Sequence, residues 1–131
     1  MTNFNHLNED GEARIVDISQ KEKTFREAVA KASIILSKSI INMIRKDQFK
    51  KGDVLNVSRI AGIAGSKKTS SLIPLCHNIP IDSVNLEIIK NIKKNSMKVK
   101  AIVKTSSKTG VEMEALTAVT ICCLTIYDMC K

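Results

Sequence analysis

Two stretches in the second half of the chain alternate between apolar and polar residues over most of their length. The first is centred on Leu86, and the second runs from Met97 to Val103 with lysines on its other side. A period of two is typical of strands with one buried face. The short polar linker 91–96 between them predicts an antiparallel hairpin whose apolar face is covered by helices.

Two earlier stretches instead show helical spacing. Thr24 and Glu27 form a capping-box pattern, and apolar residues follow at helical intervals, which predicts an amphipathic helix ending near Lys46 and Asp47. Residues 54–64 also fit a helical period, although their β-branched content leaves a strand open. Residues 13–19 predict a short edge strand.

The last stretch, residues 109–131, is the most apolar. Thr109 and Glu112 predict a second capping box, and no carboxylate or amine lies between Glu114 and Asp128. A helix that is apolar all round is buried on one side by its own domain and on the other by something else, such as another subunit. Asp128 and its neighbour three residues on, Lys131, share one helix face, either as functional groups or as ordinary end charges.

The order of elements is strand, helix, helix, strand, strand, helix. This order predicts a two-layer α+β fold with an antiparallel sheet covered by helices. The length of 131 residues suits one domain, which we expect at residues 13–131, preceded by a flexible arm at residues 1–12.

Charge and composition narrow the function. The net charge of +8 favours polyanionic partners, but the lysines are scattered, so a solvated surface stays open. With three Phe and one Tyr, single-stranded nucleic acid is disfavoured, because its binders stack bases on aromatic rings. The start has no signal-peptide pattern and no apolar run approaches about 20 residues, so we expect a cytoplasmic protein with no membrane association.

Two further stretches carry candidate chemistry. Residues 66–71 combine two lysines with hydroxyl side chains that suit phosphate, although a solvated loop explains them equally well. Pro74 and Pro80 stiffen the segment that holds Cys76 and His77, where the histidine contacts a ligand or hydrogen-bonds backbone. The spacing of the four cysteines favours free thiols over a zinc site.

Several motifs together resemble the MoaC family of molybdenum cofactor biosynthesis. They are Lys51-Gly52-Asp53, Ala61-Gly62-Ile63, Lys67-Lys68-Thr69, the run LIPLCH at 72–77, GVEMEALTA at 110–118 and LTIYDMCK at 124–131. The resemblance runs in order from about Gly11 to Lys131. It implies a ferredoxin-like fold and a homohexamer, a trimer of dimers whose active site lies at the dimer interface.

The resemblance also implies a lyase reaction. Cyclic dihydro-GTP, made by a radical SAM enzyme, is converted to cyclic pyranopterin monophosphate and pyrophosphate, with no cofactor and no metal. By motif position the catalytic residues are Asp128, Lys131, Lys51 and His77. The substrate-binding residues are Leu75, Cys76, His77, Glu112, Met113, Glu114 and Lys67.

Elementary chemistry is compatible with these roles. Ring opening and closure need several proton transfers, which suit an amine held by a carboxylate such as Lys131 beside Asp128. Lys51 and Lys67 can stabilise the charge that builds as pyrophosphate leaves. Carboxylates at 112 and 114 can accept from the guanidine-like edge of a base.

The chain departs from the family pattern in two places. Family members continue past Lys131 with a short strand and a tail rich in Gly, Ser and Lys, so we expect this tail to be absent here or the sequence to be truncated. Asn78 stands where a proline is usual. Two alternatives to an active lyase therefore remain, namely an assembled but inactive truncated family member and a basic nucleic-acid-binding protein.

Overall fold

The computed structural model of the protein describes residues 4–46 and 48–131, and it contains three strands and four helices in these residues. In chain order they are β1 (Thr24–Ile35), α1 (Lys38–Arg45), α2 (Val54–Ser66), α3 (Thr69–Leu72), β2 (Ser83–Asn91), β3 (Ser96–Ser107) and α4 (Glu112–Cys130). Residues 1–3 of the expected arm and Asp47, one of the expected helix ends, lie outside the described residues.

The sheet is antiparallel with the strand order β1-β3-β2. β3 is central, and it pairs with β1 from Thr24↔Ser107 to Ile35↔Ser96 and with β2 from Ser83↔Lys104 to Asn91↔Ser96. The hairpin predicted from alternation is therefore confirmed. Its turn contains Asn95 with a φ of 46°, a left-handed conformation that asparagine tolerates better than most residues.

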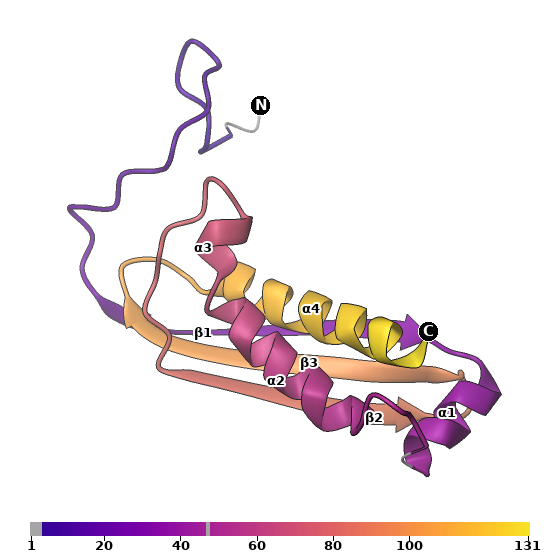
Figure 1. The fold of residues 1–131 in the computed structure, drawn as a ribbon. Coiled ribbons are helices and arrows are strands. Elements are labelled where there is room, and N and C mark those ends of the chain that lie inside the picture. The colour runs from indigo at the N-terminus through magenta and orange to yellow at the C-terminus, as the bar shows by residue number, and fades with distance from the viewer. Residues whose placement is uncertain (1–3, 47) are drawn as a thin grey trace.

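Two helices cover one face of this sheet, with α4 and α2 side by side across it (Figure 1). Alternate residues of β3 from Met97 to Val103 point into this layer and are at most 1% exposed, opposite the fully buried Ala118 and Ile126 of α4. The fold is thus the two-layer α+β arrangement that the sequence predicted. The other face of the sheet carries lysines and several exposed apolar side chains.

A small residue sets the spacing between the two helices. A Cβ added at Gly62 in α2 would lie 2.8 Å from the carbonyl oxygen of Ala118 and 3.2 Å from Cβ of Cys122, both in α4. Only glycine permits this approach, because any side chain would overlap the backbone of the opposite helix. This close contact fixes the position of α4 relative to α2 and to the turn at residues 51–53 that precedes α2.

Three local predictions were wrong. Residues 24–35 form strand β1, and helix α1 begins only at Lys38, so Thr24 and Glu27 are not a capping box. Residues 13–19 form no strand, apart from an isolated bridge between Leu7 and Ala13. α4 has Val111 as its N-cap and no side-chain cap, so Thr109 lies two residues too early to form the predicted capping box.

The expectation of no span-length apolar segment also needs correction. α4 has 19 residues, and 18 consecutive residues within it have a mean hydropathy of 1.4, so by length and composition it could cross a membrane. Length and composition alone are weak indicators, since core helices share them. One side of α4 packs on the sheet and α2, with Ala115, Ala118 and Cys122 fully buried.

Candidate functional site

Three of the predicted catalytic side chains meet at the C-terminal end of α4. Asp128 Oδ2 lies 3.4 Å from Lys51 Nζ, and Asp128 Oδ1 lies 3.5 Å from Lys131 Nζ. The Lys51 amine also donates to the Asp128 carbonyl oxygen at 2.8 Å. The Lys51 amine, and to a lesser extent Lys131, holds the pKa of the Asp128 carboxyl below its usual range. The cluster is exposed and keeps one carboxylate between two amines.

Local backbone structure explains how Lys51 reaches α4 from a distant part of the chain. It precedes Gly52, whose φ of 103° favours glycine and turns the chain into α2. Asp53 then caps α2 by accepting from the amide of Asn56 at 3.1 Å. This turn and cap fix the start of α2, and α2 packs against α4, so the lysine reaches Asp128 across the two helices.

A cavity of about 760 Å³ lies at the other end of α4. Its walls come from three segments: residues 5–21 of the N-terminal segment, residues 73–79, and residues 109–113 at the start of α4. The predicted substrate-binding residues Leu75, Cys76, His77, Glu112 and Met113 all line it. The lining is mostly apolar with a few polar groups, which is the usual composition of a small-molecule site.

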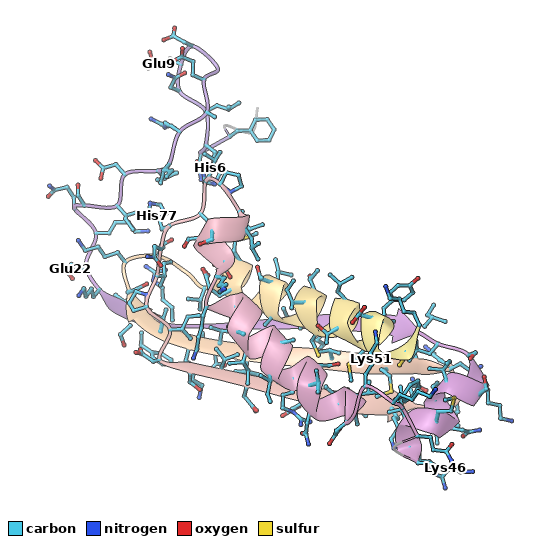
Figure 2. The ribbon with its side chains drawn as sticks, in the orientation of Figure 1. His6, Glu9, Glu22, Lys46, Lys51 and His77 are labelled. Atoms are coloured by element: carbon cyan, nitrogen blue, oxygen red, sulfur yellow. The ribbon has the colours of Figure 1, made fainter. Side chains whose placement is uncertain are left out.

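His77 connects the cavity to the N-terminal segment. Its Nε2 lies 2.6 Å from the carbonyl oxygen of Val16, and Figure 2 shows the ring next to that segment. A carbonyl only accepts, so Nε2 carries the proton in this contact. The backbone contact predicted for this histidine is confirmed; His77 also lines the cavity, and its contact with a ligand stays a prediction.

Glu114 is buried beside this cavity, in the first turn of α4, with 3% of its surface exposed. Its Oε1 lies 3.8 Å from Cys76 Sγ, and its Oε2 has no hydrogen-bond partner among the described residues. Burial raises the pKa of Glu114, and the nearby Glu112 adds to this. Burial and the Glu114 charge likewise raise the pKa of the Cys76 thiol.

The cavity wall contains two basic side chains, His6 and Lys21, that were not predicted as site residues, whereas the predicted residues Lys67 and Glu114 do not line it. His6 and Lys21 line the cavity because the N-terminal segment folds back over residues 73–79, a long-range contact with no signal in the sequence beyond positive charge. Lys67 caps the C-terminal end of α2, where it is exposed and does not line the cavity.

The cavity and the Asp128 cluster are far apart within one chain. Glu112 and Asp128 are sixteen positions apart on α4, which corresponds to about 24 Å along a helix. Figure 2 shows Lys51 and His77 correspondingly near opposite ends of the layer of helices. The structure therefore brings together two subsets of the predicted site but does not join them. Within residues 4–46 and 48–131, no three His, Cys, Asp or Glu side chains gather as metal ligands.

The protein has a two-layer α+β fold, an amine–carboxylate cluster and a cavity lined by histidine. These groups are of the kind that transfers protons to and from a small molecule. The sequence profile of the MoaC family matches residues 15–131. The chain belongs to the MoaC family.

Curated relatives point to one activity within this family. A cyclic pyranopterin monophosphate synthase from Peptoclostridium acidaminophilum is 52% identical over 98% of this chain and 80% of its own length. Proteins of the same name from Thermoanaerobacter sp. (strain X514) and Dinoroseobacter shibae are 50% and 49% identical, over 98% and 100% of this chain and 82% and 83% of their own lengths.

Proposed function

We propose that this chain is a lyase of molybdenum cofactor biosynthesis that converts cyclic dihydro-GTP to cyclic pyranopterin monophosphate and pyrophosphate. The observation that carries the proposal is the cluster of Lys51, Asp128 and Lys131, found in a chain that is about half identical to synthases of that name. A radical SAM enzyme supplies the substrate in the preceding step, and both reactions take place in the cytoplasm.

The cluster suits the proton transfers that this rearrangement needs. Asp128 holds the amine of Lys131 in a fixed direction from three residues away on the same helix, while Lys51 balances the carboxylate charge. An amine in this position takes up and returns protons as the purine ring opens and the pterin ring closes. Lys51 and Lys67 stabilise the negative charge on the departing pyrophosphate.

The cavity suits the other half of the substrate. Glu112 and the buried Glu114 accept hydrogen bonds from the guanidine-like edge of the base, and Leu75 and Met113 pack against its ring. Lys67 provides positive charge toward the phosphates, and His77 donates a hydrogen bond to them. Since these groups lie about 24 Å along α4 from Asp128, one chain alone does not assemble a complete site.

A symmetric pair of α4 helices completes it. α4 presents one continuous exposed stripe, here named the α4 stripe, consisting of Glu112, Leu116, Thr120, Leu124, Tyr127, Asp128 and the following Lys131. Its apolar members are large and open to solvent, with Leu124 and Tyr127 each 59% exposed. The spacing of three to four residues puts the whole stripe on one helix face.

The stripe is complementary to itself when two copies run antiparallel. Glu112 then faces the partner's Lys131, and Leu116 faces the partner's Tyr127, as in an isologous twofold interface. This pairing carries Asp128 and Lys131 of each protomer to the cavity of the other. We assign this contact to the dimer, and three such dimers form the homohexamer.

The test is pyrophosphate release from cyclic dihydro-GTP by the parent, by Lys131→Ala and by His77→Ala. We expect turnover by the parent, and loss in both variants with assembly unchanged. An assembled parent that leaves the substrate unchanged would refute the proposal. A protein that instead binds nucleic acid, with affinity falling steeply as salt rises, would support the nucleic-acid-binding alternative.

Mixing the variants tests the shared site. Dissociation and reassembly of Lys131→Ala with His77→Ala in equal amounts gives one intact site in each mixed dimer, so about a quarter of the parent activity returns. The matched control mixes His77→Ala with Glu114→Gln, whose altered residues come from the same half of the site, and no activity returns. Equal recovery in both mixtures, or in neither, would exclude the antiparallel pairing.

A further inference from the structure

Cys76 and Glu114 form a thiol–carboxyl contact between two segments that are far apart in sequence. The Cys76 Sγ lies 3.8 Å from Oε1 of Glu114, within hydrogen-bonding range for sulfur. Among the described residues it is the one side-chain donor that the structure gives this carboxyl. The contact therefore decides which of the two carboxyl oxygens is engaged.

Backbone geometry holds both partners in place. The Cys76 amide donates to the carbonyl oxygen of Ile73 at 3.2 Å, in the turn that contains Pro74. Successive side chains of an extended segment point to opposite sides, so Cys76 faces α4 while His77 faces the N-terminal segment. Glu114 is fixed from the other side by its place in the first turn of α4.

The second carboxyl oxygen is an unsatisfied acceptor. Glu114 is 97% buried, yet Oε2 has no partner in the described part of the chain. Buried polar atoms almost always find a hydrogen-bond partner, and an orphaned oxygen points to a proton of its own or to a missing donor. Glu114 is not among the residues that line the cavity, although its contact Cys76 and its neighbour Met113 are.

We propose that Cys76 is a positioning residue, whose thiol holds Oε1 of Glu114 and so fixes the orientation of this buried carboxyl behind the cavity wall that Cys76 itself lines. This inference rests on the proposed function for the identity of the substrate, but the thiol–carboxyl contact itself does not. Cys76 acts here through Glu114 rather than by bonding the substrate with its sulfur. The thiol remains a donor at neutral pH because burial and the Glu114 charge raise its pKa.

Opposing effects act on the Glu114 carboxyl, and their net result is a raised pKa. Burial and the charge of Glu112 on the same helix raise its pKa, whereas its own backbone amide and the Cys76 thiol lower it. Cys76 and Glu112 are the titratable groups that face it, from residues 73–79 and from α4. Removal of the thiol therefore raises the pKa of Glu114 further and favours the protonated carboxyl, which is a weaker acceptor.

The first measurement follows the Glu114 carboxyl directly, without substrate. Protein labelled with ¹³C at the glutamate carboxyls is titrated by NMR, and the Glu114 signal is assigned by its loss in Glu114→Gln. We expect a higher Glu114 pKa in Cys76→Ala and a return toward the parent value in Cys76→Ser, which retains a donor. Cys123→Ala removes another half-buried thiol with no carboxyl partner and leaves the titration unchanged.

The second measurement is the pH dependence of kcat/KM for pyrophosphate release. In Cys76→Ala the acidic limb of the profile moves to higher pH. On that limb kcat/KM falls by about tenfold, which is comparable to the loss of one hydrogen bond to a charged group. Cys76→Ser restores most of it. A purely structural role would instead lower the rate equally at every pH.

The two measurements separate the failure of this inference from the failure of the proposed function. If the parent releases no pyrophosphate, the proposed function fails, and the NMR titration still decides whether Cys76 acts on Glu114. An unchanged Glu114 pKa in Cys76→Ala would overturn the inference even in an active enzyme. So would an equal shift in Cys76→Ala and Cys76→Ser, because the donor would then be irrelevant.

Discussion

Replacement of Gly62 by alanine tests the packing of α2 on α4, which positions both ends of the site. The added Cβ would lie 2.5 Å from Leu86 Cδ1 and 2.8 Å from the Ala118 carbonyl oxygen. Carbon atoms prefer separations of about 3.5–4.0 Å, so the side chain of Leu86 must turn and the two helices must move apart. The contact with the Ala118 backbone is the more costly one, because no rotamer change relieves it.

The expected destabilisation follows from two opposing effects. Overpacking of a tight interior typically costs about 1–3 kcal/mol, while alanine in a helix gains about 1 kcal/mol over glycine. The backbone contact puts Gly62→Ala toward the upper end, so we expect a net loss of about 2 kcal/mol. For a chain of this size that corresponds to a decrease in Tm of roughly 8 °C.

The assay is thermal unfolding followed by far-UV circular dichroism at one fixed protein concentration, since assembly makes Tm depend on concentration. Gly65→Ala is the matched control on the same helix. Its Cβ would meet only side-chain atoms of Ile121, the nearest at 2.9 Å, and this side chain is not fully buried and can shift. We therefore expect a smaller decrease in Tm for Gly65→Ala than for Gly62→Ala. A Tm for Gly62→Ala equal to that of the parent would refute the packing argument.

Three further predictions concern caps, charges and thiols. Asp53→Ala removes the α2 cap and destabilises the fold by about 1 kcal/mol in urea unfolding, whereas Asp53→Asn retains most of the stability; equal losses would contradict the capping role. Lys51→Ala raises the pKa of Asp128 in a carboxyl NMR titration, because the Lys51 amine is the main cause of its lowering; an unchanged value would show that the pair does not persist in solution. Because the Asp128 pKa is lowered in the fold, the stabilisation from its ion pairs is present at neutral pH and is lost as the pH falls through that lowered value. Burial raises the pKa of the Cys122 thiol to about 12, so mass spectrometry after iodoacetamide treatment at pH 8 shows Cys122 unmodified in folded protein and modified in urea; modification at equal rates in both would contradict its burial.

The sequence was most informative where one physical requirement dominates a segment. β2 and β3 alternate cleanly because one side faces the core and the other carries lysines, so their pairing was predicted correctly. α2 and α4 were also predicted as helices. The general architecture follows from these elements, because a one-faced sheet needs helices to cover it.

Residues 24–35 were mispredicted because they fit two periods at once. Ala28, Ala30 and Ala32 lie on the inner face of β1, but alanine is also the strongest helix former. The long pairing of β1 with β3 makes this segment a strand rather than a helix. The residues of the segment alone do not indicate this tertiary contact. Thr24 and Glu27 have the spacing of a capping box by coincidence, because the pairing with β3 makes this segment a strand.

Parts of the site were predictable from local spacing, and others were not. Asp128 and Lys131 face one another as the helical spacing indicated. The contact of Lys51 with Asp128 joins positions 77 apart. Lys51 was predicted as a site residue from the resemblance to the family, not from the spacing of residues. The contributions of His6 and Lys21 depend on the path of the N-terminal segment, which few local signals constrain.

The bond between His77 and Val16 makes the N-terminal segment a competitor of any ligand that would use the same histidine proton. One Nε2 proton serves either the Val16 carbonyl or an oxygen of the ligand. A ligand that takes this proton therefore releases Val16, and the free energy of that release is subtracted from its binding free energy. By the same equilibrium, the residues around Val16 become more accessible to proteases and to amide exchange as the cavity fills.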